Sequence, residues 1–168
     1  LRFAFLILTQ QKELYVLHSA SFLYRGRAFL VSGSSGTGKS THSALWHDLY
    51  QTPLLNGDLN LLGIRNSIPY AYGLPWCGTS GICTPKDYPL GGIIFLKQAA
   101  IDQVQSLQPD EKVLHILQRM ISPAWTKELL LRNLHFSEAL APLIFSCRLY
   151  CTKEPSAART LKAVIDAL

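Results

Sequence analysis

The chain has 168 residues, 48% of them hydrophobic, which is typical of one globular domain with its own core. Sixteen Lys and Arg against eleven Asp and Glu give a formal net charge of +5. The basic residues are scattered, and no run of them alternates with aromatic residues. We therefore expect a modest attraction for anions and no nucleic-acid partner.

The apolar start of the chain, residues 3–8, is too short to span a bilayer, and no small-residue cleavage site follows it. We predict a strand there and expect a cytoplasmic protein without a membrane partner. Because the chain opens at Leu1 and its only methionine is Met120, we also expect that upstream residues are missing.

Strand-like stretches follow at 14–18, 21–24 and 28–32, the last after a turn at 25–27. We therefore predict an antiparallel meander ahead of the next segment, which is rich in glycine. In the simplest nucleotide-binding folds such a segment follows the first strand of a βα repeat, so this order is informative.

The segment 33–40, Gly-Ser-Ser-Gly-Thr-Gly-Lys-Ser, fits the Walker A pattern G-x-x-x-x-G-K-[ST] at every specified position. We call this segment the phosphate loop, after the role that the pattern predicts. Its glycines let successive backbone N–H groups turn around an anion, and the helix predicted at 41–50 adds a partial positive charge. The alternative, a Gly/Ser linker, does not explain the apolar strand before it and the helix after it. The predicted ATP-binding residues are Gly33, Ser34, Ser35, Gly36, Thr37, Gly38, Lys39, Ser40 and Thr41.

An apolar strand at 53–56 leads to Gly57 and Asp58, nineteen positions after Lys39. A carboxylate in this position faces bound Mg²⁺ in many phosphate-loop proteins, so we predict that Ser40 and Asp58 hold Mg²⁺. The alternative is an aspartate that only serves the turn. A hairpin is predicted next, with strands at 59–64 and 68–72.

Residues 73–91 contain several glycines and prolines and show little periodicity. Such a loop either closes over a substrate or is a well-packed connection, and the sequence favours neither. Cys77 and Cys83 lie in it, and Cys147 and Cys151 lie later in the chain. We expect all four to be free thiols, with a zinc site from Cys77, Cys83 and a histidine as the weaker alternative.

The rest of the chain predicts a strand at 93–96, helices at 110–122 and from 123 or 124 to about 140, and a strand at 144–150. A last helix is expected to begin with Ser156 as its cap. No repeat or low-complexity linker divides the sequence. We therefore predict a single mixed α/β domain over residues 1–168.

Further charged candidates are His18, Arg119 and Lys97. His18 precedes the phosphate loop by one hairpin, although a histidine packed in the core is the default interpretation. Arg119 and Lys97 could supply charge to a transferring phosphoryl group, but a helical arginine is more often solvated. The other histidines, at 42, 47, 115 and 135, lie on helical segments and are predicted to be structural.

The residues at 14–64 resemble the catalytic domain of HPr kinase/phosphorylase, which shares its phosphate-loop architecture with the ATP-dependent phosphoenolpyruvate carboxykinases. The likeness rests on the loop form G-x-S-G-x-G-K-S, on His18 and Gly26 upstream, and on Asp58, which matches the second of two adjacent family aspartates. It implies an α/β fold with a mixed sheet of that type flanked by helices. It also implies Mg²⁺ and ATP, a serine-bearing small protein or peptide as acceptor, and catalytic roles for His18, Lys39 and Asp58.

One departure concerns the first family aspartate, expected to help activate the acceptor hydroxyl, because Gly57 stands in its place. The glutamate-bearing segment of the family has no clear counterpart either. Our main hypothesis is therefore a serine kinase-like phosphotransferase, and the alternative is a nucleotide-binding regulatory module without turnover. Phosphoenolpyruvate carboxykinase chemistry would need basic and metal-binding residues that the sequence does not show, and the oligomeric state, including a homo-oligomer, is left open.

Overall fold

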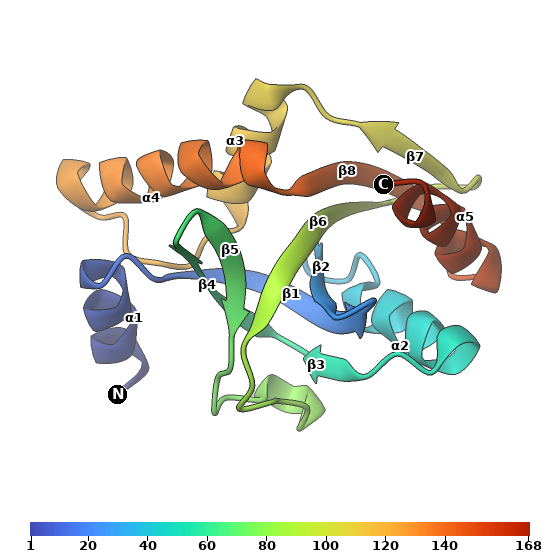
Figure 1. Cartoon of the computed structure of the whole chain (residues 1–168), viewed down its shortest axis with the longest axis horizontal. Coiled ribbons are helices and arrows are strands. Elements are labelled where there is room, and N and C mark those ends of the chain that lie inside the picture. The colour runs from blue at the N-terminus through green and yellow to red at the C-terminus, as the bar shows by residue number, and fades with distance from the viewer.

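An eight-stranded mixed β-sheet runs through the molecule and carries helices on both faces (Figure 1). The structure is a computed structural model that describes residues 1–78 and 80–168. Within these residues no helix combines the length and the apolar content that crossing a bilayer requires.

The helices are α1 (Arg2–Gln11), α2 (Lys39–Tyr50), α3 (Pro109–Arg119), α4 (Lys127–Leu140) and α5 (Pro155–Asp166), with short 3-10 turns η1 (Gly78–Ser80) and η2 (Ala141–Leu143). The strands are β1 (Tyr15–Tyr24), β2 (Arg27–Ser32), β3 (Leu54–Asn56), β4 (Leu59–Arg65), β5 (Ile68–Tyr72), β6 (Tyr88–Gln98), β7 (Gln103–Ser106) and β8 (Phe145–Cys151).

Two long strands, β1 and β6, hold the sheet together because each changes partner along its length. The first half of β1 pairs with β4 and its second half pairs with β2, both antiparallel. The start of β6 pairs antiparallel with β5, and the rest lies parallel to both β2 and β8. The order is β2-β1-β4-β5-β6-β8-β7, and the β2–β6 pairing closes a ring through β1, β4 and β5.

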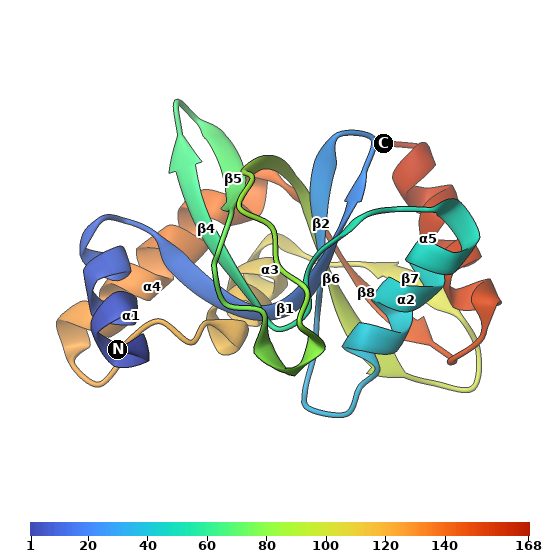
Figure 2. The same ribbon diagram turned by 90° about the horizontal axis from the view of Figure 1, so that it is seen from below.

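Successive residues of the central strands serve two cores on opposite faces of the sheet. In β6, Ile93 and Phe95 pack with α3 and α4, while Ile94 and Leu96 pack with α2 and α5. Figures 1 and 2 both show α2 and α5 side by side over one end of the sheet. There the buried Trp46 of α2 stacks on Phe22 with ring centroids 4.4 Å apart. The helix that follows the phosphate loop is thus fixed by a large apolar contact.

The predicted α/β class, the mixed sheet and most of the elements are confirmed. The strand expected at 3–8 is wrong, because this segment begins α1. Its buried residues Leu6, Thr9 and Gln10 follow helical spacing. The Gln10 amide donates to Pro123 O at 2.9 Å and to Asn133 Oδ1 at 2.8 Å, and these partners lie far along the chain. Tertiary contacts therefore decide the helix.

Three smaller expectations also differ from the structure. The stretches 14–18 and 21–24 fall in the single strand β1 (Tyr15–Tyr24), because Ser19 and Ser21 are buried and bonded to Asn60 on β4. The meander ahead of the phosphate loop is therefore the hairpin of β1 and β2. Strand β7 is not among the predicted elements. Glu154 stands at the N-cap position of α5 without a side-chain cap bond, and the Ser156 hydroxyl donates to Asp102.

The cysteines divide into a bonded pair and two buried thiols. Cys77 and Cys83 form a disulfide, so the expectation of four free thiols is wrong for this pair. The glycine-rich segment between them turns back so that their Cα atoms lie 4.8 Å apart. Cys147 and Cys151 are free, as expected, and burial raises the pKa of the Cys147 thiol to about 12. Residues 1–78 and 80–168 contain no cluster of three His, Cys, Asp or Glu side chains that could bind zinc.

We predict that protein purified and denatured without reductant shows two reactive thiols, and that reduction before denaturation raises the number to four. Thiol titration with a chromogenic disulfide reagent measures this directly. The double variant Cys77→Ser and Cys83→Ser should give two thiols under both conditions. Four thiols in the unreduced wild-type protein would contradict the pairing.

His42 is a buried histidine in α2, one turn after the phosphate loop. Its Nε2 accepts the Trp46 indole N–H at 3.3 Å, which assigns the ring proton to Nδ1, and burial lowers its pKa to about 4. The folded state therefore holds this ring neutral where the unfolded chain, with a histidine pKa near 6.5, would bind a proton.

We predict that the free energy of unfolding falls by on the order of 3 kcal/mol as the pH drops from about 6.5 to about 4, since each pKa unit corresponds to about 1.4 kcal/mol. A lowered folded-state pKa gives stability that is present above the unfolded pKa and lost toward the folded pKa. The variant His42→Gln, whose amide oxygen can still accept from Trp46, should flatten this dependence in urea titrations. The exposed His135→Gln is the matched control, and an equal effect of both variants would refute the assignment.

Candidate functional site

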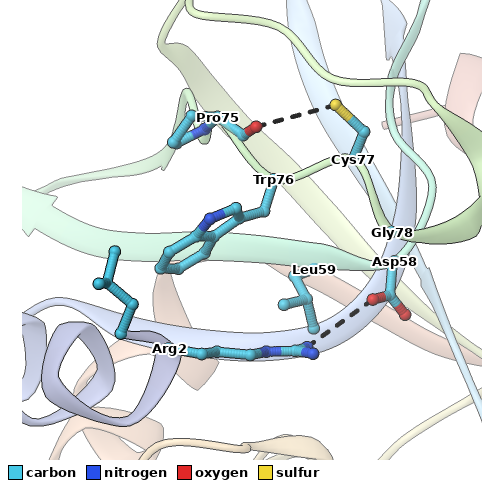
Figure 3. A pocket seen from close by; sticks show the side chains of 8 residues that line it. Arg2, Asp58, Leu59, Pro75, Trp76, Cys77 and Gly78 are labelled. Carbon is cyan, nitrogen blue, oxygen red and sulfur yellow. Dashed lines mark hydrogen bonds and ion pairs between the residues drawn. The ribbon is translucent and has the colours of Figure 1, made fainter.

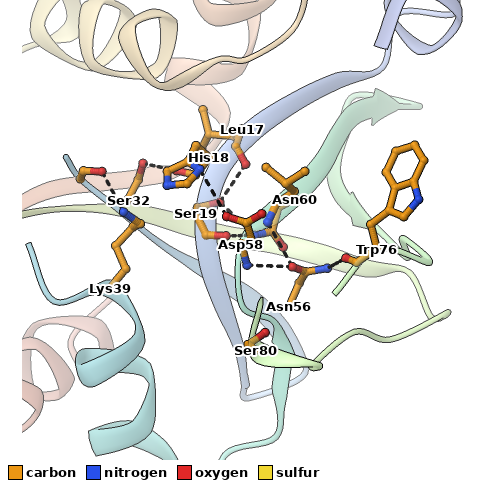
Figure 4. Close-up of polar contacts among 12 residues, drawn as sticks. Leu17, His18, Ser19, Ser32, Lys39, Asn56, Asp58, Asn60, Trp76 and Ser80 are labelled. Carbon is orange, nitrogen blue, oxygen red and sulfur yellow. Dashed lines mark hydrogen bonds and ion pairs between the residues drawn. The ribbon is translucent and has the colours of Figure 1, made fainter. Parts of the chain in front are cut away.

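The register of β1 brings the phosphate loop and the Asp58 turn to one place. His18 pairs with Leu59 of β4, directly beside Asp58, and the next residue, Ser19, pairs with Ser32, which ends β2. The Ser32 hydroxyl donates to His18 O at 2.7 Å, and the Ser19 amide donates to Asp58 O at 3.0 Å. At this crossing point β1 therefore joins the two segments that the sequence singled out (Figure 4).

The phosphate loop leaves the carboxyl end of β2 and enters α2. Gly36 and Gly38 have φ of +77° and +98°, a conformation that side chains disfavour, and a Cβ at either would meet open space. The first N–H groups of α2 have no preceding helical turn to bond to, so they are available to an anion. The loop is therefore a turn open to solvent at Gly36 and Gly38, which have the conformation expected of them, whereas Gly33 does not have a positive φ.

Side chains from α2 and β6 hold this loop in shape. Lys39 Nζ donates to Gly33 O at 3.1 Å and to Ser34 O at 3.2 Å, so the ammonium group lies across the loop. Gln98, at the end of β6, donates to Gly36 O at 3.0 Å. The two Lys39 bonds go to neutral carbonyl oxygens. A charged phosphate oxygen at the loop would make a stronger bond with the same ammonium group.

His18 and Asp58 face each other across the crossing point, with His18 Nδ1 3.5 Å from Asp58 Oδ1. Both side chains are partly exposed. Burial is the largest cause of a lowered His18 pKa; the charge of Lys39 adds to it, and Asp58 opposes it. A neutral His18 that donates its Nδ1 proton toward Asp58 has Nε2 free as a proton acceptor.

Arg119 also lies at the loop, although a solvated helical arginine was the default expectation. Its Nη2 donates to Ser34 Oγ at 3.3 Å. The chain after α3 crosses β1, with a bridge between Leu17 and Met120, and this delivers Arg119 next to His18. The pKa of Lys39 is lowered, chiefly by burial and then by the Arg119 charge, while Asp58 opposes the shift, so the two cations stand close to each other.

Lys97 was weighed equally with Arg119 from the sequence, but it is exposed and lies 5.5 Å from the centroid of the Tyr150 ring. The other histidines lie on α2, α3 and α4, and most of them have partners of their own. His115, for example, contacts Arg148 at 2.6 Å. We see no contact that assigns Lys97 to the site.

The loop between β5 and β6 packs on the Asp58 turn. Asn56 Oδ1 accepts the amides of Asp58 and Leu59 at 2.9 and 3.1 Å, and the Asn56 amide group donates to Trp76 O at 2.9 Å. A Cβ added to Gly78 would lie 2.5 Å from the Asp58 Cβ. The disulfide-bearing loop is thus a close-packed wall of the site, which favours the packed connection of the two alternatives.

Gly57, which replaces a family aspartate, is also explained by this packing. A Cβ at position 57 would lie 2.1 Å from Ser80 Oγ and 2.6 Å from Ser80 Cβ. The Ser80 hydroxyl is itself fixed, because it donates to Cys77 O at 2.7 Å and accepts from the Ile82 amide at 3.2 Å. The position has no room for a second carboxylate while Ser80 stays where it is.

The residues expected to hold Mg²⁺ are placed differently. Asp58 is half-buried and central, whereas Ser40 is exposed in the first turn of α2. The carboxylate and hydroxyl oxygens are ligand types that Mg²⁺ accepts, and this ion commonly takes most of its remaining ligands from water and phosphate. No larger cluster of metal-ligating side chains occurs in the part of the chain that the structure describes. The donor set therefore fits a metal that arrives with a nucleotide.

Sequence reasoning missed Arg2, Asn56 and Gln98, and it considered Trp76 only as part of the loop at 73–91. Arg2 Nη2 lies 3.8 Å from Asp58 Oδ2, and it reaches the site only because residues 2–11 form a helix. Asn56 carried a signal that could have been used, since Asn-Gly-Asp after a strand is a typical side-chain-bonded turn. The positions of Gln98 and Trp76 at the site depend on contacts between distant segments, which no local sequence pattern indicates.

No protein-family model matches the chain, and no curated protein matches it. Among solved structures, the chain is similar to the Hpr(Ser) kinase/phosphatase from Coxiella burnetii, with a TM-score of 0.45 and 9% sequence identity. The match covers 90% of this chain and 98% of that one.

We predict that Gly57→Ala lowers the free energy of unfolding by about 1 to 3 kcal/mol, because the new methyl group overlaps Ser80. In a Ser80→Gly background the same substitution should cost less than half as much. Urea titrations of the four proteins give the coupling between the two positions as a double-mutant cycle. An equal loss with and without the serine side chain would show that Ser80 does not exclude a side chain at position 57.

Proposed function

We propose that the chain binds Mg·ATP at the phosphate loop and transfers the γ-phosphoryl group to a hydroxyl, that of a serine in a small protein or peptide. The observation that carries the proposal is the convergence of Lys39, Asp58 and His18 at the end of β2. Lys39 belongs to the Walker A pattern at 33–40. His18 Nδ1 and Asp58 Oδ1 lie 3.5 Å apart beside this segment. A cation, a carboxylate and a neutral imidazole are the groups this reaction needs.

Each residue has a role that its environment supports. The loop amides and Lys39 bind the β and γ phosphates. Arg119, which donates to Ser34 Oγ in the same loop, adds a second positive charge near them. Ser40 and Asp58 hold Mg²⁺, which would neutralise charge on the phosphates. His18 contacts the transferring group or its acceptor, and its free Nε2 can take the hydroxyl proton. Phosphoryl transfer asks mainly for positioning and charge neutralisation, and this cluster provides both.

A second function, a nucleotide-dependent binding module without turnover, is favoured by one observation. Ser80 fills the space at Gly57, so Asp58 is the only carboxylate of the turn and would have to serve both metal and acceptor. Incubation with γ-labelled ATP and a pool of serine peptides separates the two functions. A kinase moves the label to peptide, and a binding module leaves it in intact ATP.

We predict that Lys39→Ala weakens ATP binding and slows label transfer about a hundredfold, since one lost contact to a transferring phosphoryl group typically costs about 3 kcal/mol. Calorimetry measures the affinity, and the label assay measures the rate. Lys127→Ala, an exposed lysine at the start of α4, is the matched control and should behave as the wild type. Unchanged binding and turnover in Lys39→Ala would end the assignment of this loop to a nucleotide.

A further inference from the structure

A pocket of about 460 Å³ lies beside Asp58, between α1 and the loop that carries the disulfide (Figure 3). Trp76 and Pro75 form one wall, Leu59 lies at the base, and the Arg2 side chain runs along the opposite wall. Asp58 and Gly78 close one end. The phosphate-loop residues do not line it.

Asp58 is the residue that the pocket and the phosphate loop share. Its Oδ1 faces His18, whose pKa is lowered in part by the charge of Lys39. Its Oδ2 faces Arg2 in the pocket. A molecule held in the pocket therefore meets Asp58 from the side opposite to the loop. In a transfer reaction the two reactants must approach the shared groups from different directions.

The chemistry of the pocket favours a neutral, apolar occupant. The charged side chains that line it are Arg2 and Asp58, which lie 3.8 Å apart, so the lining carries no net side-chain charge. The other lining residues are Leu1, Leu59, Pro75, Trp76, Cys77 and Gly78, none of which has a charged side chain. Trp76 is itself fixed by edge contact with Phe5 of α1, with centroids 4.4 Å apart, so its face is presented to the pocket in a set orientation.

The volume has room for a bulky side chain but not for a folded protein. The pocket also opens to solvent, so an extended segment can place one side chain in it while its backbone stays outside. A hydroxyl on the adjacent residue would then stand at the Asp58 end. This arrangement would select acceptors by the residue next to the hydroxyl.

We propose that this pocket is the acceptor subsite, and that it takes a bulky apolar side chain, such as leucine or phenylalanine, next to the serine that receives the phosphoryl group. The assignment rests on the proposed function. Burying such a side chain should raise the affinity of the peptide about tenfold or more over a glycine neighbour.

The test uses the full chain with Mg²⁺ and a non-hydrolysable ATP analogue, titrated with end-capped pentapeptides Ala-Ala-Ser-Xaa-Ala and Ala-Xaa-Ser-Ala-Ala. Xaa is Leu, Phe, Glu or Gly. Binding is followed by the indole ¹H–¹⁵N signals of the three tryptophans, and the Trp76 signal is assigned with Trp76→Phe. The expected result is a shift of the Trp76 signal, with Leu and Phe peptides in at least one series binding about tenfold tighter than the Gly peptide.

Variants separate the pocket from the rest of the surface. Trp76→Ala should lose the preference for Leu and Phe over Gly, while its affinity for the ATP analogue stays that of the wild type. Trp125→Ala is the matched control, since this tryptophan is exposed and lies outside the pocket. Should Trp76→Ala misfold, the wild-type Trp76 signal still decides the question.

Three outcomes would overturn the subsite: a peptide affinity independent of Xaa, tightest binding of the Glu peptides, or shifts that spare Trp76. Failure of the proposed function looks different, because bound peptides would then never acquire label from γ-labelled ATP although the Trp76 signal responds to them. Such a result would retain the pocket as a binding site and remove the transfer reaction.

Discussion

The hydrogen-bond register of β1 at residues 18 and 19 is the constraint on which the candidate site depends. One strand pairs with β4 up to His18 and with β2 from Ser19 onward, so the Asp58 turn and the phosphate loop are separated by a single residue step on their common neighbour. A slip of one residue would turn His18 to the other face of the sheet and move Ser32 away from it. The buried bonds from Asn60 to Ser19 O at 2.8 Å and from Ser21 to Asn60 Oδ1 at 2.7 Å oppose such a slip, because breaking either leaves a buried polar group unpaired.

Around this fixed point the site is completed by segments with less regular structure. Asn56 ties the Asp58 turn to the backbone of Trp76, and the disulfide between Cys77 and Cys83 confines the residues that contact Gly57 and Asp58. Closing a short loop reduces the conformations open to it in the unfolded chain. The sheet therefore positions His18 and Asp58, while the cross-linked loop determines what can stand beside them. This division explains why the local sequence around Gly57 does not show why a glycine stands there. Its neighbour Ser80 comes from a different part of the chain.

The sequence predicts what local patterns encode and misses what distant contacts decide. The turn at 33–38, the apolar strand before Asp58 and the period of the helices all reflect local chemistry, and these elements appear near the expected residues. The helices differ at their ends, because α3 stops at Arg119 and α4 begins only at Lys127. Residues 3–8 are apolar throughout, so their period cannot separate strand from helix, and the contacts of Gln10 with Pro123 and Asn133 settle it. The disulfide, the bond from Gln98 to Gly36 and the place of Arg119 depend on the meeting of remote segments. For Arg119 the signal was ambiguous in principle, because a helical arginine looks the same whether its helix ends at a solvent face or at a loop.

The balance of charge at the site follows from the same geometry. Lys39 and Arg119 lie on the phosphate-loop side of His18 and Asp58, and Arg2 pairs with Asp58 on the pocket side. Burial is the largest cause of the lowered pKa values of His18 and Lys39, and nearby cations add to it because like charges held together are unfavourable. In the function that we propose, an anion placed beside Lys39 and Arg119 would remove this repulsion and favour the protonated form of Lys39. The relief of repulsion would then add to the affinity for a polyphosphate.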